Sequence, residues 1–141
     1  MEILTRSNIV TGCPSTDPES AILRCGRMLV DSGYAKERYI TGMLARNRSF
    51  SVAIGNLIAI PHGEKEYKDD VIATGLAVLA YPGGIDWGGE PVKLVIGIAA
   101  QGDEHLEILA RIVEVAEDQE AVDALAKATD AEAIHAAFTQ D

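Results

Sequence analysis

Apolar residues recur at helical spacing in two segments near the start of the chain. Residues 16–19 read Thr-Asp-Pro-Glu, the form of a capping box with proline in the first helical turn. The apolar residues at positions 21, 22, 25, 28 and 29 then share one face of a helix that Gly33 ends. A second helix is predicted from about Ala35, with apolar or aromatic residues at positions 39, 40, 43 and 44 on one side and Arg46 close to its C-terminal end.

Uncharged segments in the middle of the chain predict β-strands. Residues 52–60, VAIGNLIAI, are rich in β-branched side chains and are closed by Pro61, so they form one strand or two short ones broken near Gly55-Asn56. Further strands are predicted at 72–81 and, after the turn-rich segment PGGIDWGGEP, at 92–100. Because such continuous apolar runs are typical of strands covered on both faces, we expect helices on each side.

The last third of the chain is predicted to be helical, in segments 103–116, 119–127 and 130–138. The first of these is expected to turn positions 106, 109, 110 and 113 toward the core. Two helices, three strands and three helices in this order predict an α/β fold, a mixed β-sheet flanked by helices on both faces. Since the 141 residues contain no repeat or linker, residues 1–141 are expected to form a single domain.

Charge and composition narrow the possible partners and location. Twelve Lys and Arg against 22 Asp and Glu give a formal net charge of −10, which disfavours nucleic acid and anionic membranes as partners. The longest segment that could suggest a membrane span, 49–63, is shorter than the roughly 20 apolar residues of a spanning helix, and the N-terminus lacks the features of an export signal. Cys13 and Cys25 form no metal-binding pattern and are expected to stay reduced, so we expect a cytoplasmic protein without a metal site.

Two histidines are candidate reactive side chains. His62 follows an apolar strand, between Pro61 and the flexible Gly63. His105 lies in the first turn of a predicted helix, where free backbone N–H groups favour an anion such as phosphate. Each also has a purely structural interpretation: His62 as a strand-end cap and His105 as a polar residue filling a helix start. His135, on the last amphipathic helix, is interpreted as a surface or packing residue.

Phosphoryl chemistry would use both histidines together. Both are predicted at or just beyond strand ends, the edge where open α/β sheets bind ligands. A neutral imidazole can attack phosphorus when its other nitrogen is held by a hydrogen bond and nearby donors neutralise the charge of the transferring group. Arg46 could be such a donor, or it could only offset the helix dipole. A hydrolase using both histidines is disfavoured, because no serine or cysteine nucleophile motif accompanies them.

Several segments together resemble one protein family. Residues 43–46, MLAR, and 55–63, GNLIAIPHG, resemble the phosphorylation-site signature of the mannitol/fructose class of enzyme IIA in the bacterial sugar phosphotransferase system. The segments that look similar to its mannitol-type branch are SGY at 32–34, YPGGI at 81–85 with WG at 87–88, KLVIGIAA at 93–100 and GDEHL at 102–106. The resemblance covers nearly the whole chain, and it implies the sandwich fold of this class in a stand-alone IIA protein.

The resemblance also implies roles for individual residues. His62 would accept a phosphoryl group from the phosphocarrier HPr and pass it to a cysteine of the IIB component of a mannitol (hexitol) permease, without a cofactor. His105 would match the second active-site histidine, which helps hold the phosphoryl group, and Arg46 would neutralise its charge. Asn56 replaces a glutamate of some relatives; together with Gly63 it is expected to bind or orient the reacting groups.

Two functional interpretations stay open. One is delivery of phosphate to a mannitol-type permease. The other is a fructose-type or nitrogen-regulatory IIA, whose phosphorylation at His62 controls partner proteins. The YPGGI and GDEHL segments look closer to the mannitol branch. Partners would dock through a small surface, with Leu57, Ile60 and Tyr67 as candidate rim residues, and the acidic charge predicts salt-sensitive association with basic side chains.

Overall fold

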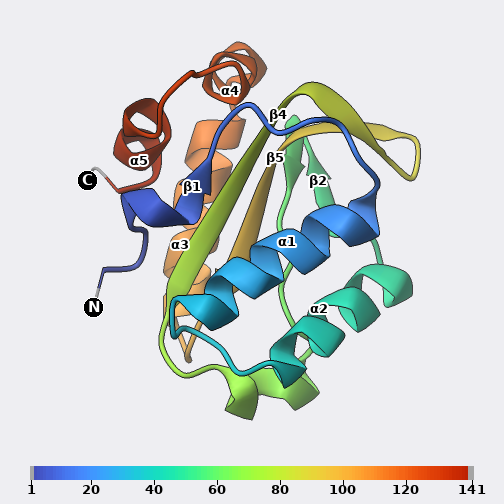
Figure 1. Cartoon of the computed structure of the whole chain (residues 1–141), viewed down its shortest axis with the longest axis vertical. Coiled ribbons are helices and arrows are strands. Elements are labelled where there is room, and N and C mark those ends of the chain that lie inside the picture. Colours follow the sequence, from blue (N-terminus) through green and yellow to red (C-terminus); the bar gives the residue numbers. More distant parts are fainter. Residues whose placement is uncertain (1, 140–141) are drawn as a thin grey trace.

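A single mixed β-sheet forms the centre of the computed structural model, which describes residues 2–139 (Figure 1). The strands are β1 (Ile9–Val10), β2 (Ala53–Gly55), β3 (Leu57–Ala59), β4 (Gly75–Trp87) and β5 (Glu90–Ala99), in the spatial order β1-β4-β5-β3-β2. The pairs β1–β4 and β3–β5 are parallel, whereas β4–β5 and β2–β3 are antiparallel. The segment 52–60 therefore forms two short strands that break at Asn56, one of the two predicted forms.

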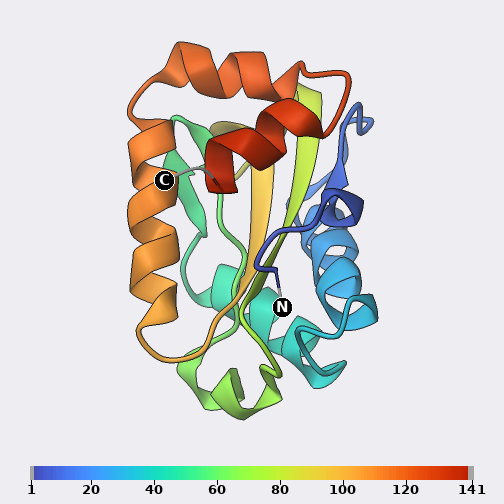
Figure 2. The ribbon, with the colours of Figure 1, turned by 90° about the vertical axis from the view of Figure 1, so that its left-hand side faces the viewer.

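Helices cover both faces of the sheet, as Figure 2 shows from the side. One layer consists of α1 (Pro18–Asp31) and α2 (Arg38–Ser49), and the other of α3 (Glu104–Ala116), α4 (Gln119–Ala126) and α5 (Glu132–Thr139). Two short 3₁₀-helices, η1 (Arg6–Asn8) and η2 (Lys65–Asp70), lie in the connections. The predicted α/β fold is confirmed. None of the helices within residues 2–139 has the length and apolar character that crossing a membrane requires.

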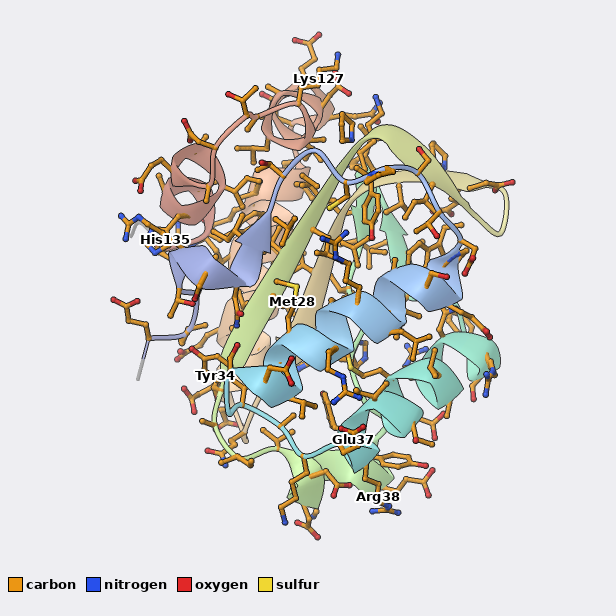
Figure 3. All side chains as sticks on the ribbon, in the orientation of Figure 1. Met28, Tyr34, Glu37, Arg38, Lys127 and His135 are labelled. Atoms are coloured by element: carbon orange, nitrogen blue, oxygen red, sulfur yellow. The ribbon has the colours of Figure 1, made fainter. Side chains whose placement is uncertain are left out.

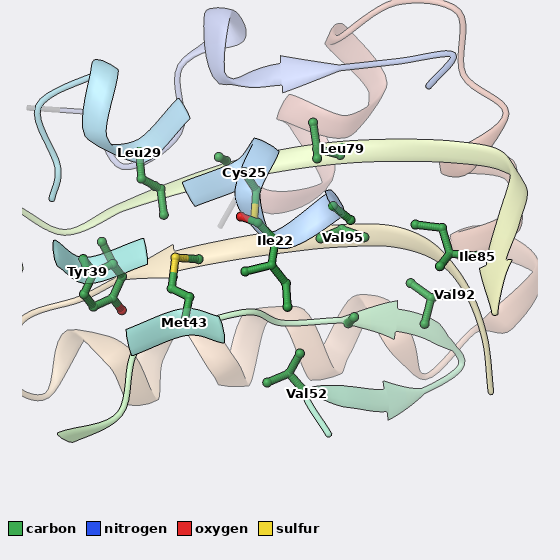
Figure 4. Packing of buried hydrophobic residues seen from close by; sticks show 14 of the residues in the cluster. Ile22, Cys25, Leu29, Tyr39, Met43, Val52, Leu79, Ile85, Val92 and Val95 are labelled. Atoms are coloured by element: carbon green, nitrogen blue, oxygen red, sulfur yellow. The ribbon is translucent and has the colours of Figure 1, made fainter. Parts of the chain in front are cut away.

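The alternation of side chains along β4 produces a separate core on each face. Ala77, Leu79 and Tyr81 pack under α1 and α2, whereas the intervening Leu76 and Val78 pack under α3, α4 and α5. Figure 4 shows the first core, in which Cys25 and Met43 meet the sheet. Because β3 and most of β5 are buried, their C-terminal ends are held rigidly where the candidate histidines follow.

The first helix begins one residue later than a capping box led by Thr16 would place it. Asp17 is the N-cap: its carboxylate accepts a hydrogen bond from the backbone N–H of Ser20 at 2.8 Å, and Pro18 is the first helical residue. The hydrogen bonds hold the pKa of Asp17 below its usual value. The helix ends at Asp31, before Gly33 with φ of 87°.

Two sequence predictions were wrong in detail. The segment PGGIDWGGEP is mostly strand: β4 continues to Trp87, and only Gly88 and Gly89, with φ of 63° and 97°, form the turn. The core-facing side of α3 consists of Ile108, Ile112 and Ala116, whereas Leu106 is 66% exposed and Val113 is 51% exposed. The predicted set of core-facing residues and the observed set both recur at helical spacing, so the periodicity alone did not distinguish them. The two-residue strand β1 was missed.

Candidate active site

His62 lies at the end of β3, next to β5. It forms an isolated parallel bridge with Ile98, and the backbone N–H of Ile98 donates to the carbonyl of Pro61 at 2.9 Å. The Nδ1 atom of His62 lies 2.7 Å from the carbonyl oxygen of Ile60. Since a carbonyl can only accept, Nδ1 carries the proton, and Nε2 keeps its lone pair. The ring is thus fixed in the tautomer that a nucleophile at Nε2 requires.

The surroundings of His62 favour its neutral form. Burial lowers the pKa of the half-buried imidazole; its hydrogen bond to the carbonyl of Ile60 opposes this shift, and electrostatic interactions with His105 and Arg46 add to it. Burial also lowers the pKa of His105. Both rings are therefore uncharged at neutral pH, and His62 is available as a nucleophile without losing a proton first.

His105 meets His62 at this edge of the sheet. It is the second residue of α3, which follows β5 after a short loop, and Figure 2 shows the start of α3 at the same end of the molecule as η2. The two ring centroids are 5.4 Å apart, and the ring planes meet edge to face at 60°. The predicted convergence of the two imidazoles is therefore observed, and it follows from β3 running parallel to β5.

A small hydrogen-bond network fixes the start of α3. The hydroxyl of Thr74 donates to the carboxylate of Glu104 at 3.0 Å and accepts from the backbone N–H of Gln101 at 3.1 Å. Thr74 is only 8% exposed, so these bonds are shielded from water. Because Glu104 directly precedes His105, the network sets where the second imidazole enters the site.

The two histidines line one cavity of about 590 Å³. Its wall also contains three basic residues, Arg46, Lys65 and Lys68; the remaining lining residues are Tyr39, Gly63, Glu64, Val71, Ala100, Gly102 and Leu106. A positive group of this kind is unusual on a chain of formal charge −10, and it suits an anionic ligand. The three basic side chains and two neutral imidazoles can together bind and transfer a phosphoryl group.

Arg46 reaches the cavity from the last turn of α2. Its Nη1 donates to the carbonyl oxygen of Phe50, just beyond the helix end, and its guanidinium carbon lies 5.8 Å from the centroid of the exposed Phe50 ring. One nitrogen of the planar group is thus bonded at the helix end, and the other donors remain for an anion. Arg46 therefore offsets the dipole at the C-terminal end of α2 and also lines the cavity, so the two interpretations of this residue are compatible.

Lys65 and Lys68 are site residues that the sequence analysis did not single out. Both belong to η2, which is held against α2 because the ring of Tyr67 packs on Gly42: a Cβ built on this glycine would lie 2.5 Å from the ring. Arg38 also packs on this ring, with its guanidinium carbon 4.8 Å from the Tyr67 centroid. The only signal in the sequence was their position three and six residues after His62.

The other expected positions divide between the cavity and the rest of the molecule. Gly63 lines the cavity. Asn56 lies at the opposite end of β3, where its amide donates to the carbonyl of Ala116 at 2.6 Å, and it is absent from the cavity wall. His135 belongs to α5 and packs against the N-terminal segment, with its Nε2 3.1 Å from the carbonyl oxygen of Leu4 (Figure 3). The structure thus brings His62, His105, Arg46 and Gly63 together and leaves Asn56 outside.

Comparison with known proteins identifies the family of the chain. A family model described as "Phosphoenolpyruvate-dependent sugar phosphotransferase system, EIIA 2" matches residues 2–141. This chain belongs to that family. It is an enzyme IIA component of the sugar phosphotransferase system, and the resemblance carried by residues 55–63 and 102–106 is confirmed.

Individual relatives place this enzyme IIA near proteins named for mannitol. The mannitol-specific phosphotransferase enzyme IIA component of Staphylococcus aureus strain Mu50 is 40% identical over 139 residues, which cover 99% of this chain and 96% of the relative. The enzyme IIAMTL of Escherichia coli, solved in complex with phosphorylated enzyme IIBMTL, matches with a TM-score of 0.90 and 31% identity over 97% of each chain. The crystal structure of the E. coli IIA mannitol matches with a TM-score of 0.88 and 33% identity, over 96% of this chain and 98% of that one. The expected IIA-type fold is confirmed.

Proposed function

We propose that this enzyme IIA is a phosphohistidine carrier, in which His62 accepts a phosphoryl group from HPr and passes it to the IIB component of a mannitol-type permease. The observation that supports this most directly is the hydrogen bond from His62 Nδ1 to the carbonyl of Ile60, at 2.7 Å. It leaves the Nε2 lone pair of a neutral imidazole in a cavity lined by Arg46 and two lysines.

The transfer is a displacement at phosphorus. The Nε2 lone pair of His62 forms a bond to phosphorus while the bond between phosphorus and the donor atom breaks, and the electron pair of that bond stays on the donor. The proton remains on Nδ1, and its hydrogen bond to the Ile60 carbonyl stabilises the positive charge that develops on the ring. In the second transfer, a cysteine thiolate of IIB attacks phosphorus, and the N–P electron pair returns to Nε2.

The neighbouring residues act on the charge of the phosphoryl group. Arg46 offers paired donors to its oxygens, and His105 contacts the same group from the other side of the cavity. Gly63 lets the ring of Tyr39 pack against the backbone next to His62. Asn56 holds the β2–β3 hairpin on the end of α3 through its bond to Ala116, and we assign it no contact with the phosphoryl group.

The partners and the place of action are part of the same proposal. The relatives reported above carry the name mannitol, and one was solved with phosphorylated IIB, which supports a mannitol-type IIB as acceptor over the regulatory alternative. HPr as donor rests on the family resemblance. We further propose that residues 1–141 act as one IIA domain in the cytoplasm, where the buried, unpaired thiols of Cys13 and Cys25 stay reduced.

Labelling tests the carrier role. The protein is incubated with enzyme I, HPr and labelled phosphoenolpyruvate, and an acid-labile adduct is expected on the wild type and absent from His62→Ala. His135→Ala is the matched control, because this histidine lies outside the cavity, and it should label like the wild type. Equal labelling of His62→Ala and wild type would refute the proposal.

A further inference from the structure

The backbone after His62 is attached to β5 through a side chain. In a parallel ladder, the residue after a bridge partner donates its N–H to the carbonyl of the residue opposite, here from Gly63 to Ile98. The N–H of Gly63 also meets the hydroxyl oxygen of Tyr39, to which it donates at 2.9 Å, and this hydroxyl donates to the carbonyl of Ile98 at 2.7 Å. The tyrosine hydroxyl therefore links the two backbone groups that face one another at this point of the ladder.

The ring of Tyr39 is fitted to this place. A Cβ built on Gly63 would lie 2.5 Å from Cε1 of Tyr39, so the ring reaches the backbone only because residue 63 is a glycine. Tyr39 is 4% exposed, and burial raises its pKa to about 12. The hydroxyl thus stays protonated at neutral pH and keeps both of its hydrogen bonds.

Both neighbours of His62 are consequently tied to the same residue of β5. On one side, the carbonyl of Pro61 accepts from the N–H of Ile98; on the other, Gly63 is tied through the hydroxyl to the carbonyl of Ile98. The chain continues from β5 to His105. Tyr39 belongs to α2, and Arg46 lies seven residues later on the same face of this helix. Tyr39 therefore sets the backbone of His62 relative to the other two site residues.

We propose that Tyr39 is a positioning residue for phosphoryl transfer, acting on His62 through the backbone of Gly63. This inference rests on the function proposed above. Loss of the hydroxyl would remove the link between the N–H of Gly63 and the carbonyl of Ile98, so the chain after His62 would shift. A displacement of about 1 Å at a reacting group can cost up to about 100-fold in rate. Tyr39 is only 4% exposed, so we expect the substitution to act on the transfer step and not on the docking of HPr.

The test compares two buried tyrosines. Tyr39→Phe removes only the hydroxyl, and Tyr34→Phe is the matched control, because the Tyr34 hydroxyl also donates to a backbone carbonyl, that of Glu2, and is absent from the cavity wall. Single-turnover transfer from labelled HPr is measured as a function of HPr concentration. For Tyr39→Phe we expect the saturating rate to fall about tenfold or more, with an unchanged half-saturating concentration. For Tyr34→Phe, the saturating rate and the half-saturating HPr concentration should both stay within about twofold of the wild-type values.

Each result decides the proposal. A wild-type saturating rate in folded Tyr39→Phe would overturn it, and so would a loss confined to the half-saturating concentration, which would mark a docking residue. If Tyr39→Phe does not fold, Gly63→Ala replaces it: the added methyl meets the Tyr39 ring, so the same loss of saturating rate is expected, and its absence overturns the proposal. Labelling of His62→Ala in the same assay would refute the carrier role itself, which separates the two failures.

Discussion

The imidazoles of His62 and His105 lie edge to face with their centroids 5.4 Å apart, and burial lowers the pKa of both. Two neutral rings at this distance do not repel one another, and each keeps a nitrogen for a different task. His62 has its Nδ1 bonded to Ile60 and offers Nε2 as the nucleophile. His105, at the start of α3, is placed to contact the group once it is transferred.

Replacing His105 should affect transfer more than acceptance. In His105→Ala the nucleophile and its hydrogen bond to Ile60 remain, so the protein should still be labelled by HPr. The onward step to IIB should slow on the order of 10²-fold, the usual loss when one donor to a developing charge is removed. Quenched-flow transfer from the labelled variant to IIB measures this, and a rate equal to the wild type would contradict the role given to His105.

The rate of phosphoryl acceptance should fall with acidity only below the ordinary histidine range. Burial lowers the pKa of His62 below the usual histidine value of 6.5, so its neutral form persists at pH 6.5 and is lost as the pH falls further. In the same pH window the unfolded chain binds the proton more readily than the folded one, so the free energy of unfolding also decreases as the pH falls.

Arg46→Gln removes a positively charged neighbour of His62 and should raise the pKa of its imidazole. NMR titration of the imidazole would show this, and an unchanged or lower value would contradict it.

Asn56 should matter for stability rather than for transfer. Asn56→Ala removes the hydrogen bond to the carbonyl of Ala116, which should cost about 1 kcal/mol in the free energy of unfolding. Because residue 56 is outside the cavity wall, labelling by HPr should stay within about twofold of the wild type. Urea unfolding and the labelling assay give both values; a large loss of labelling in the folded variant would place Asn56 in the site after all.

Lys65 and Lys68 of η2 should increase the rate of phosphoryl acceptance through their positive charges. Lys65→Gln combined with Lys68→Gln leaves the nucleophile untouched and removes two positive charges from the cavity wall. Acceptance from HPr should slow several-fold at low ionic strength and approach the wild-type rate at about 1 M salt, where charges are screened within about 3 Å. A deficit that is independent of salt would contradict an electrostatic role.

The fold could be predicted because its strands are nearly continuous apolar runs. Segments such as 92–100 have few alternatives to a doubly covered strand, and the helices on both faces follow from that. The orientation of α3 could be predicted only in part: Leu109 packs against the core as expected, but Ile108 and Ile112 are more deeply buried, and Leu106 and Val113 are exposed. The short β1 was not recognisable because two residues carry no periodicity.

The site was predictable as far as local sequence determined it. His62 and His105 follow strands that end at the same edge, so their meeting follows from topology. Nothing in the sequence indicated that Tyr39 belongs to the site, because its proposed positioning role depends on a hydrogen bond with Gly63, 24 residues away along the chain. Asn56 belongs to the signature but is separated from His62 by the length of β3, a distance that the sequence motif does not express.

The central claim is that the Nε2 atom of His62 carries the phosphoryl group while Nδ1 stays bonded to Ile60. NMR of the phosphorylated, ¹⁵N-labelled protein measures this directly, through the coupling between phosphorus and the imidazole nitrogens. The account predicts coupling to Nε2 of His62 with a proton retained on Nδ1. Phosphorus on Nδ1, or on any other residue, would contradict it.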